Sequence, residues 1–159
     1  MSRHMLTVMI PSNRTYKDGS PKGMDGLNEI ISYNRTNRYK AASIERENVE
    51  WCAWHIKQAM QQQGWQPMLN RKTARPCQVA VTFIEPNRRR DFSNIVGGGL
   101  KFLLDALSRP RGNKLGAAAI YDDSQTWLPT CVPHVRTEKG QAYLYVTVVK
   151  YDRLEGADD

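Results

Sequence analysis

The sequence has little cysteine and no long hydrophobic run. Its three cysteines, Cys52, Cys77 and Cys131, are far apart and odd in number, which favours reduced thiols over a disulfide framework, and no C-x-x-C zinc spacing occurs. No run of roughly 18 apolar residues is present, so the sequence predicts no membrane-spanning helix. Residues 1–5 lack the apolar stretch of a signal peptide, and we therefore expect a cytoplasmic protein with no membrane partner.

Acidic residues are fewer than basic ones. The chain has 23 Lys and Arg against 16 Asp and Glu, which gives a net charge of +7, and arginine outnumbers lysine 14 to 9. An arginine-rich surface is typical of proteins that bind phosphate-rich polymers, although a merely solvated basic surface has the same composition. The length of 159 residues and the hydrophobic content of 40% predict a single soluble domain over residues 1–159 with a core of its own.

Hydrophobic patterns predict four strands. Residues 77–84 and 141–151 alternate in character, as half-buried strands do. Short apolar runs that end at a proline or at two aspartates predict further strands over residues 6–11 and 117–121. These four segments are expected to form one sheet.

Two helices are expected to cover this sheet. Over residues 43–63 apolar side chains recur at spacings of three and four, with Ser43 as the expected N-cap and Gly64 as the C-terminal stop. A second apolar helix ends at about Leu107. Residues 12–40 show no period and predict a long basic loop. The order along the chain, β-α-β-α-β-β, predicts an α/β (α+β) fold in which helices pack on a mixed sheet.

Two acidic segments flank the second helix. Asp91 follows three arginines at the start of this helix, and Asp122 and Asp123 end the expected strand at 117–121. If that strand lies beside strand 77–84, the acidic residues fall at neighbouring strand ends, where ligands collect in α/β sheets. Carboxylates beside arginines suit Mg²⁺ or Mn²⁺ together with phosphate. The alternative is a helix cap at Asp91 and a turn at the aspartate pair.

Basic residues surround the strand at 77–84. Between residues 71 and 90 the only acid is Glu85, whereas a solvated face more often interleaves its signs. We expect six residues of this cluster to bind DNA phosphates: Arg71, Lys72, Arg75, Arg88, Arg89 and Arg90. A second basic stretch combines cations with aromatic rings, as surfaces that bind single strands do. It contains Tyr33, Arg35, Arg38, Tyr39 and Lys40.

The sequence around the acidic residues resembles the RusA-like Holliday junction resolvases. The resemblance is carried by RRRDFSNI at 88–95, Lys101, DAL at 105–107 and YDDSQ at 121–125, and the first strand followed by residues 11–13 fits the same layout. These proteins are Mg²⁺-dependent homodimeric endonucleases of bacteria and their prophages. The resemblance implies a crossover junction endodeoxyribonuclease, active in DNA recombination and repair, that resolves four-way or branched DNA junctions by paired phosphodiester hydrolysis.

The same resemblance implies roles for individual residues. Asp91 and Asp123 would be metal ligands, with Asp122 as an auxiliary carboxylate. Lys101 would contact the scissile phosphate or assist the leaving group, and Asn94 would orient the site locally. The arginines at 88–90 would bind the backbone of the junction.

Two departures from the family pattern make catalysis an open question. Where the pattern Asp-x-Asp-Asn has its second carboxylate, this chain has Ser93, a neutral and weaker oxygen ligand. A run of glycines at 97–99 lengthens the segment before Lys101, and it predicts a bulge, a close backbone approach or a loop before a helix that starts near Leu100. The alternative function is a DNA-binding protein of the same fold that is catalytically weakened or inactive. A generic RNA-binding domain is a third option, although the RNP-type aromatic motif is missing.

Overall fold

The computed structural model describes residues 4–112 and 115–152, which form a mixed α+β architecture. Its main sheet has four strands in the order β1-β6-β4-β5. β4 pairs in parallel with β5 and antiparallel with β6, and β1 pairs antiparallel with β6. The strands are β1 (Met5–Pro11), β4 (Cys77–Glu85), β5 (Thr130–Thr137) and β6 (Tyr143–Lys150).

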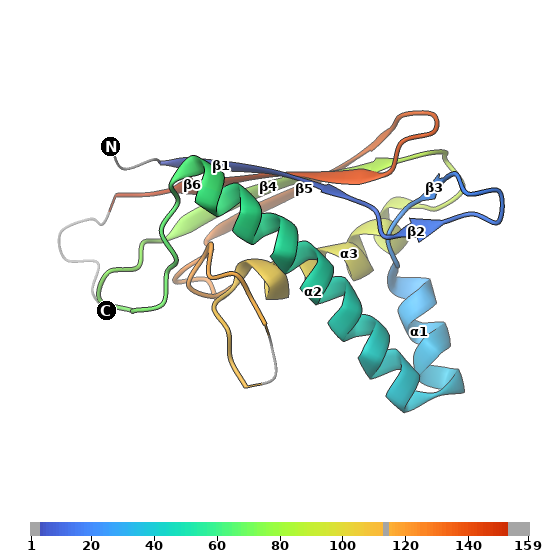
Figure 1. Cartoon of the computed structure of the whole chain (residues 1–159), viewed down its shortest axis with the longest axis horizontal. Coiled ribbons are helices and arrows are strands. Elements are labelled where there is room, and N and C mark those ends of the chain that lie inside the picture. Colours follow the sequence, from blue (N-terminus) through green and yellow to red (C-terminus); the bar gives the residue numbers. More distant parts are fainter. Residues whose placement is uncertain (1–3, 113–114, 153–159) are drawn as a thin grey trace.

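Three helices lie on one side of this sheet: α1 (Leu27–Thr36), α2 (Arg38–Gln63) and α3 (Phe92–Leu107). α2 contacts β1 and α3, and α3 also contacts α1 and β5. Figure 1 shows α1 and the first half of α2 extending away from the sheet as a pair of helices. Among the described residues no helix has both the length and the apolar character that crossing a membrane requires.

The core lies between the sheet and the helices, as the periodicity predicts. Every second side chain of β4 and β6 is buried, and so is one stripe of α2. Burial of one face gives a strand an apolar period of two residues and a helix one of about 3.6 residues, so both patterns can be recognised in the sequence. The buried residues of these elements include Cys77, Val79, Val81, Phe83, Leu144, Val146, Val148, Cys52, Ala53 and Ile56.

The long loop predicted at 12–40 is wrong. This segment contains a small hairpin, β2 (Arg14–Thr15) and β3 (Pro21–Lys22), followed by α1. No residue of α1 is buried, and its aliphatic side chains, Leu27, Ile30 and Ile31, form a stripe too short to predict a helix. Tertiary contacts hold it instead, because Asn94 in α3 accepts a hydrogen bond from the backbone N–H of Asn28 (2.7 Å).

α2 begins earlier than predicted. Asn37, not Ser43, is its N-cap, and the Asn37 side chain accepts hydrogen bonds from the backbone N–H groups of Tyr39 and Lys40. The predicted stop is confirmed, since Gly64 has a φ of 70° and closes the helix in the left-handed conformation.

The strand predicted at 117–121 is also wrong. The segment is buried but irregular, with Ala118 at a φ of 59°, and it pairs with the end of α3 instead of with β4. Ala117 donates to the carbonyl of Ala106 (2.7 Å), and Ile120 donates to that of Leu107 (3.0 Å). β4 lies between β6 and β5, and β5 is a half-exposed edge strand that was not predicted and that contains Pro133.

The glycines at 97–99 lie inside a continuous α3, so the alternatives of a break or of a helix start near Leu100 are wrong. A Cβ atom on Gly98 would lie 2.5 Å from the carbonyl carbon of Gly26, and one on Gly99 would lie 2.5 Å from Cε1 of Phe83. The glycines therefore allow the segment before α1 and the β4 strand to pack directly on the backbone of α3.

Candidate metal and DNA site

Asp91 lies at the exposed N-terminus of α3, directly after the loop that leaves β4. Its Oδ1 atom accepts hydrogen bonds from the backbone N–H of Asn94 (3.1 Å) and the hydroxyl of Ser93 (3.3 Å). Among the described residues its Oδ2 atom has no hydrogen-bond partner, and the residue is exposed. Asp91 is thus the N-cap of α3, and only one of its two carboxylate oxygens serves in that role.

Asp122 and Asp123 lie at the other end of α3. The chain before them is fixed to the end of this helix, because Arg109 donates to the carbonyl of Tyr121 (3.2 Å). Asp122 Oδ1 accepts hydrogen bonds from the N–H (2.9 Å) and hydroxyl (2.6 Å) of Ser124, which forms a turn. Asp123 is exposed.

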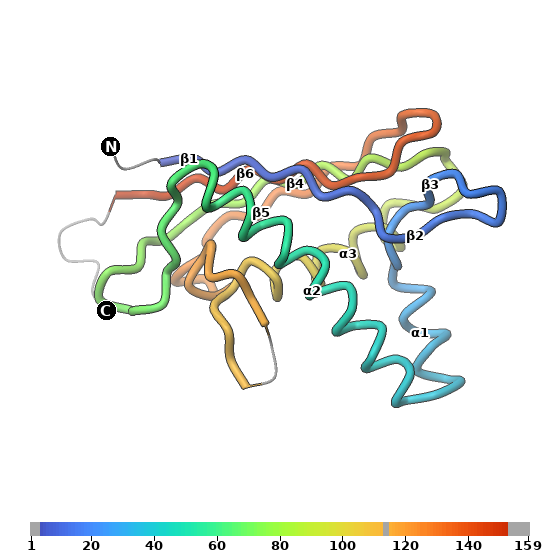
Figure 2. The backbone as a smooth tube through the Cα atoms, in the orientation of Figure 1, coloured from blue at the N-terminus to red at the C-terminus, as the bar shows by residue number. Residues whose placement is uncertain are grey.

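One chain does not bring these two acidic segments together. The 16 residues of α3 separate them, which is about 24 Å along the helix axis. Two oxygens that bind the same Mg²⁺ lie within roughly 4 Å of each other. Figure 2 shows the two segments at opposite ends of α3. Among the described residues of one chain, no three His, Cys, Asp or Glu side chains are grouped to hold a metal ion.

The reason for this separation is the identity of the strand beside β4. Because β5 runs parallel to β4, its start lies beside the start of β4, and Asp123 precedes β5 by only a few residues. Asp91 instead follows the end of β4. The two segments therefore lie at opposite ends of the strands, and not at neighbouring strand ends as expected.

Lys101 lies on the exposed side of α3 and faces α2. Its Nζ atom forms an ion pair with Glu45 Oε1 (3.6 Å), and its side chain is largely exposed. It lies ten residues after Asp91 in the same helix, about 15 Å along the axis. Lys101 therefore does not lie beside the Asp91 carboxylate of its own chain.

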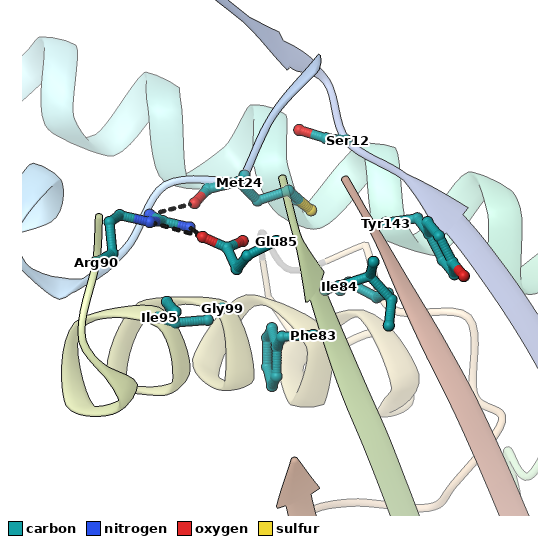
Figure 3. A pocket seen from close by; sticks show the side chains of 11 residues that line it. Ser12, Met24, Phe83, Ile84, Glu85, Arg90, Ile95, Gly99 and Tyr143 are labelled. Atoms are coloured by element: carbon teal, nitrogen blue, oxygen red, sulfur yellow. Dashed lines mark hydrogen bonds and ion pairs between the residues drawn. The ribbon is translucent and has the colours of Figure 1, made fainter. Parts of the chain in front are cut away.

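Arg90 is held inside the protein, whereas Arg88 and Arg89 are exposed. Its Nε and Nη2 atoms donate to Glu85 Oε1 (2.9 and 2.7 Å), and Nη1 donates to the carbonyl of Met24 (2.8 Å), as Figure 3 shows. Nη1 also contacts Glu29 Oε1 (3.2 Å). We therefore assign Arg90 to the fold and keep only Arg88 and Arg89 in the exposed basic surface.

The surroundings of Glu85 explain why Arg90 is needed there. Burial raises the pKa of the Glu85 carboxyl, and the charge and hydrogen bonds of Arg90 oppose this shift. The cavity beside the pair has a volume of about 10 Å³, which is room for about one water molecule. The space around Glu85 and Arg90 is thus filled by side chains and has no room for a ligand.

Asn94 has a structural role of the same kind. It is buried in the first turn of α3, and its side-chain oxygen caps the N-terminus of α1 through the N–H of Asn28. A second buried network fixes the same region. Asp25 pairs with Arg14 (2.8 Å) and accepts from Asn48 Nδ2 (3.0 Å), which ties the hairpin to α2.

The remaining predicted basic residues lie at the other end of β4 from Asp91, before the start of this strand. Arg71 and Lys72 are exposed, and Arg75 is partly exposed, in the turn before β4. This turn adjoins the Asp122 segment, because Cys77 donates to the carbonyl of Trp127 (2.9 Å) and Met68 to that of Ala118 (2.7 Å). Each end of α3 thus lies near one acidic segment and one group of exposed basic residues.

Sequence reasoning missed three lysines that join Arg89 at the Asp91 end. Lys17 and Lys22 come from the β2–β3 hairpin and Lys139 from the turn between β5 and β6, and all three line one groove with Arg89. Their separation along the chain left no local signal of this grouping. Only the pairing of the strands brings these segments together.

The donor set fits a hard divalent cation, provided that both acidic segments contribute. Asp91, Asp122 and Asp123 offer carboxylate oxygens, the ligands that Mg²⁺ and Mn²⁺ prefer.

Neither a scan against protein-family models nor a search of curated proteins finds a match for this chain. The functional assignment depends on the residues and their geometry.

Proposed function

We propose that the protein is a Mg²⁺- or Mn²⁺-dependent endonuclease of the RusA type that cuts four-way or branched DNA junctions as a homodimer. The observation that carries this proposal is the position of the two acidic segments at opposite ends of α3, each beside exposed basic residues. Such an arrangement is incomplete in one chain and becomes complete when two chains are related by a two-fold axis.

The geometry of the pair follows from symmetry. A two-fold axis across the middle of α3 sets two copies of this helix antiparallel, so the N-terminus of one lies beside the C-terminus of the other. Asp91 of one protomer then faces the Asp122–Asp123 segment of its partner. The exposed positions of α3 that the partner would approach are Ser93, Gly97 and Lys101, which lie beside Leu27 of α1 and Glu45 of α2.

In this dimer the residues of the chain have distinct tasks. Asp91, with its unoccupied Oδ2, and the two aspartates of the partner would hold the ion. A divalent ion supplies Lewis-acid chemistry, since it polarises a phosphate oxygen and lowers the pKa of a bound water. Arg88 and Arg89 from one chain and Arg71 and Lys72 from the other would bind the DNA backbone. Two such sites would make paired cuts in a two-fold symmetric junction.

The test is cleavage of a synthetic four-way junction with and without Mg²⁺. We expect Asp91→Asn and Asp123→Asn each to lower the cleavage rate by roughly 100-fold or more, because each removes a charged ligand, while junction binding is retained. Glu50→Gln, an exposed carboxylate on α2, is the matched control and should cleave like the wild type. Full activity of either aspartate variant would contradict the ligand assignment.

Ser93 favours a second candidate function, a junction-binding protein without turnover. Its hydroxyl donates to Asp91, where a second carboxylate would add charge to the site. Lys101 is also engaged with Glu45, away from Asp91. This candidate predicts junction binding without cleavage in Mg²⁺ or Mn²⁺, and cleavage that emerges in Ser93→Asp. Robust cleavage by the wild type would exclude it.

A further inference from the structure

Three separate segments form a groove at the Asp91 end of the molecule. The β2–β3 hairpin, the loop between β4 and α3, and the turn between β5 and β6 meet at this end (Figure 1). The groove is widely open to solvent and has a volume of about 750 Å³. Its polar lining comes mainly from Tyr16, Lys17, Lys22, Asn87, Arg89 and Lys139.

The groove is strongly basic. It contains four cations and one acid, Asp18, whose Oδ1 atom accepts hydrogen bonds from the N–H (2.9 Å) and hydroxyl (2.5 Å) of Ser20. Within the described residues, none of the four cations forms an ion pair with a carboxylate. Arg14 and Arg90, by contrast, are each paired internally. The groove therefore presents positive charge that the protein itself does not neutralise.

Tyr16 holds two of these cations in place. Lys22 Nζ lies 5.8 Å and Arg89 Cζ 5.6 Å from the centre of the Tyr16 ring, which is the range of cation–π contacts. The Tyr16 hydroxyl accepts a hydrogen bond from Asn87 Nδ2 (2.9 Å), which fixes the ring against the loop before α3. Two like charges gathered around one ring repel each other, and a bound anion relieves that repulsion.

We propose that this groove binds the sugar–phosphate backbone of the DNA strand that leads to Asp91. Its four cations come from three segments of the chain, which suits contacts to more than one phosphate, and Arg89 is two residues from Asp91. The inference rests on the proposed function for the identity of the polyanion. It requires neither the metal ion nor cleavage, because phosphate contacts are electrostatic and independent of sequence.

The first experiment removes charge from the groove. Lys22→Ala/Lys139→Ala is compared with Arg46→Ala/Lys57→Ala, two exposed cations of α2, by fluorescence anisotropy with a labelled four-way junction over a series of salt concentrations. We expect the groove variant to bind roughly tenfold or more weakly at low salt, with a salt slope smaller by about 2. The α2 variant should keep most of the wild-type affinity. Equal affinities and slopes for the groove variant and the wild type would overturn the inference.

The second experiment tests Tyr16 as a positioning residue. Tyr16→Ala removes the ring without changing the number of charges, and Tyr16→Phe keeps the ring but loses the bond to Asn87. We expect Tyr16→Ala to bind the junction more weakly than the wild type, with an unchanged slope of log affinity against log salt concentration. Tyr16→Phe should bind with near-wild-type affinity. Wild-type affinity in Tyr16→Ala would show that the ring does not position the cations.

The two proposals fail in different ways. If the groove variants bind DNA like the wild type while Asp91→Asn abolishes cleavage, the groove inference is overturned and the proposed function stands. If the groove variants lose binding while Asp91→Asn still cleaves, the ligand assignment is overturned and the groove stands.

Discussion

Arg90 connects three segments of the chain next to the proposed site. Its guanidinium contacts Glu85 at the end of β4, the carbonyl of Met24 before α1, and Glu29 in the first turn of α1. A run of three arginines in the sequence gives no means of telling which one is buried. The structure separates them, because only the last of the three points back toward the core.

We predict that Arg90→Met destabilises the protein by about 3 kcal/mol at neutral pH, because it leaves the Glu85 carboxylate buried without its partner. Burial raises the pKa of Glu85 above its usual 4.5, so the folded state binds this proton more tightly than the unfolded state does. Stability in the variant therefore falls as pH rises from about 4.5 toward the raised pKa. Denaturant titrations at several pH values measure this dependence.

The control for this prediction is Glu85→Gln/Arg90→Met, which removes the charge together with its partner. It should recover much of the stability lost at neutral pH and should lack the pH dependence of Arg90→Met between pH 4.5 and neutrality. A destabilisation of Arg90→Met that is equal at all pH values would contradict the role assigned to the buried pair.

At the scale of elements, α3 determines the layout of the site. Its glycine face lets the Gly26 segment lie directly on it, and this contact fixes where α1 begins. Its two ends carry the two acidic segments. The close contact at Gly98 is with backbone atoms, which cannot move aside as a side chain can.

We predict that Gly98→Ala lowers the free energy of unfolding by about 2 kcal/mol, because its Cβ would lie 2.5 Å from the carbonyl carbon of Gly26. For a chain of this length such a loss lowers Tm by about 4–8 °C. Gly97→Ala is the matched control. Its Cβ would meet only the Leu27 side chain, at 3.3 Å, and the better helix propensity of alanine offsets this contact. Equal melting temperatures for the two variants would contradict the account of the glycine face.

Elements that bury one face could be predicted from the sequence, and the others could not. β4, β6 and most of α2 have clear periods because one side of each packs in the core. α1 buries no residue and has only a short aliphatic stripe, and β5 is a half-exposed edge strand that contains Pro133, so neither was predicted. The run at 117–121 is apolar because it is buried against α3, and burial alone does not make a strand.

The candidate site could be predicted only in part, for the same reason. Asp91, Asp122 and Asp123 were recognised as acidic residues in basic surroundings, and their exposure or turn geometry leaves oxygens for a ligand. Their separation depends on β5 as the parallel neighbour of β4. The sequence analysis placed the run at 117–121, and not β5, beside β4. It therefore wrongly expected the two acidic segments to meet within one chain.

At the scale of the whole molecule, the proposed activity requires two chains. In the proposed dimer, the acidic and basic residues at each end of α3 would form half of a site, and a two-fold axis would join the halves twice. We predict that the purified protein is a particle of twice the 18.2 kDa chain mass in light scattering. A monomer at the concentrations that cleave DNA would contradict this arrangement.

The most direct test of the account is complementation between two inactive variants. Asp91→Asn and Asp123→Asn protomers are co-expressed, and the heterodimer is assayed on a four-way junction with Mg²⁺ beside each homodimer. If each site takes Asp91 from one chain and Asp123 from the other, the heterodimer contains one site with both aspartates intact, and it should nick the junction once while both homodimers remain inactive. If wild-type protein cleaves but the heterodimer does not, Asp91 and Asp123 do not form a shared site between the two chains, and the central claim is contradicted.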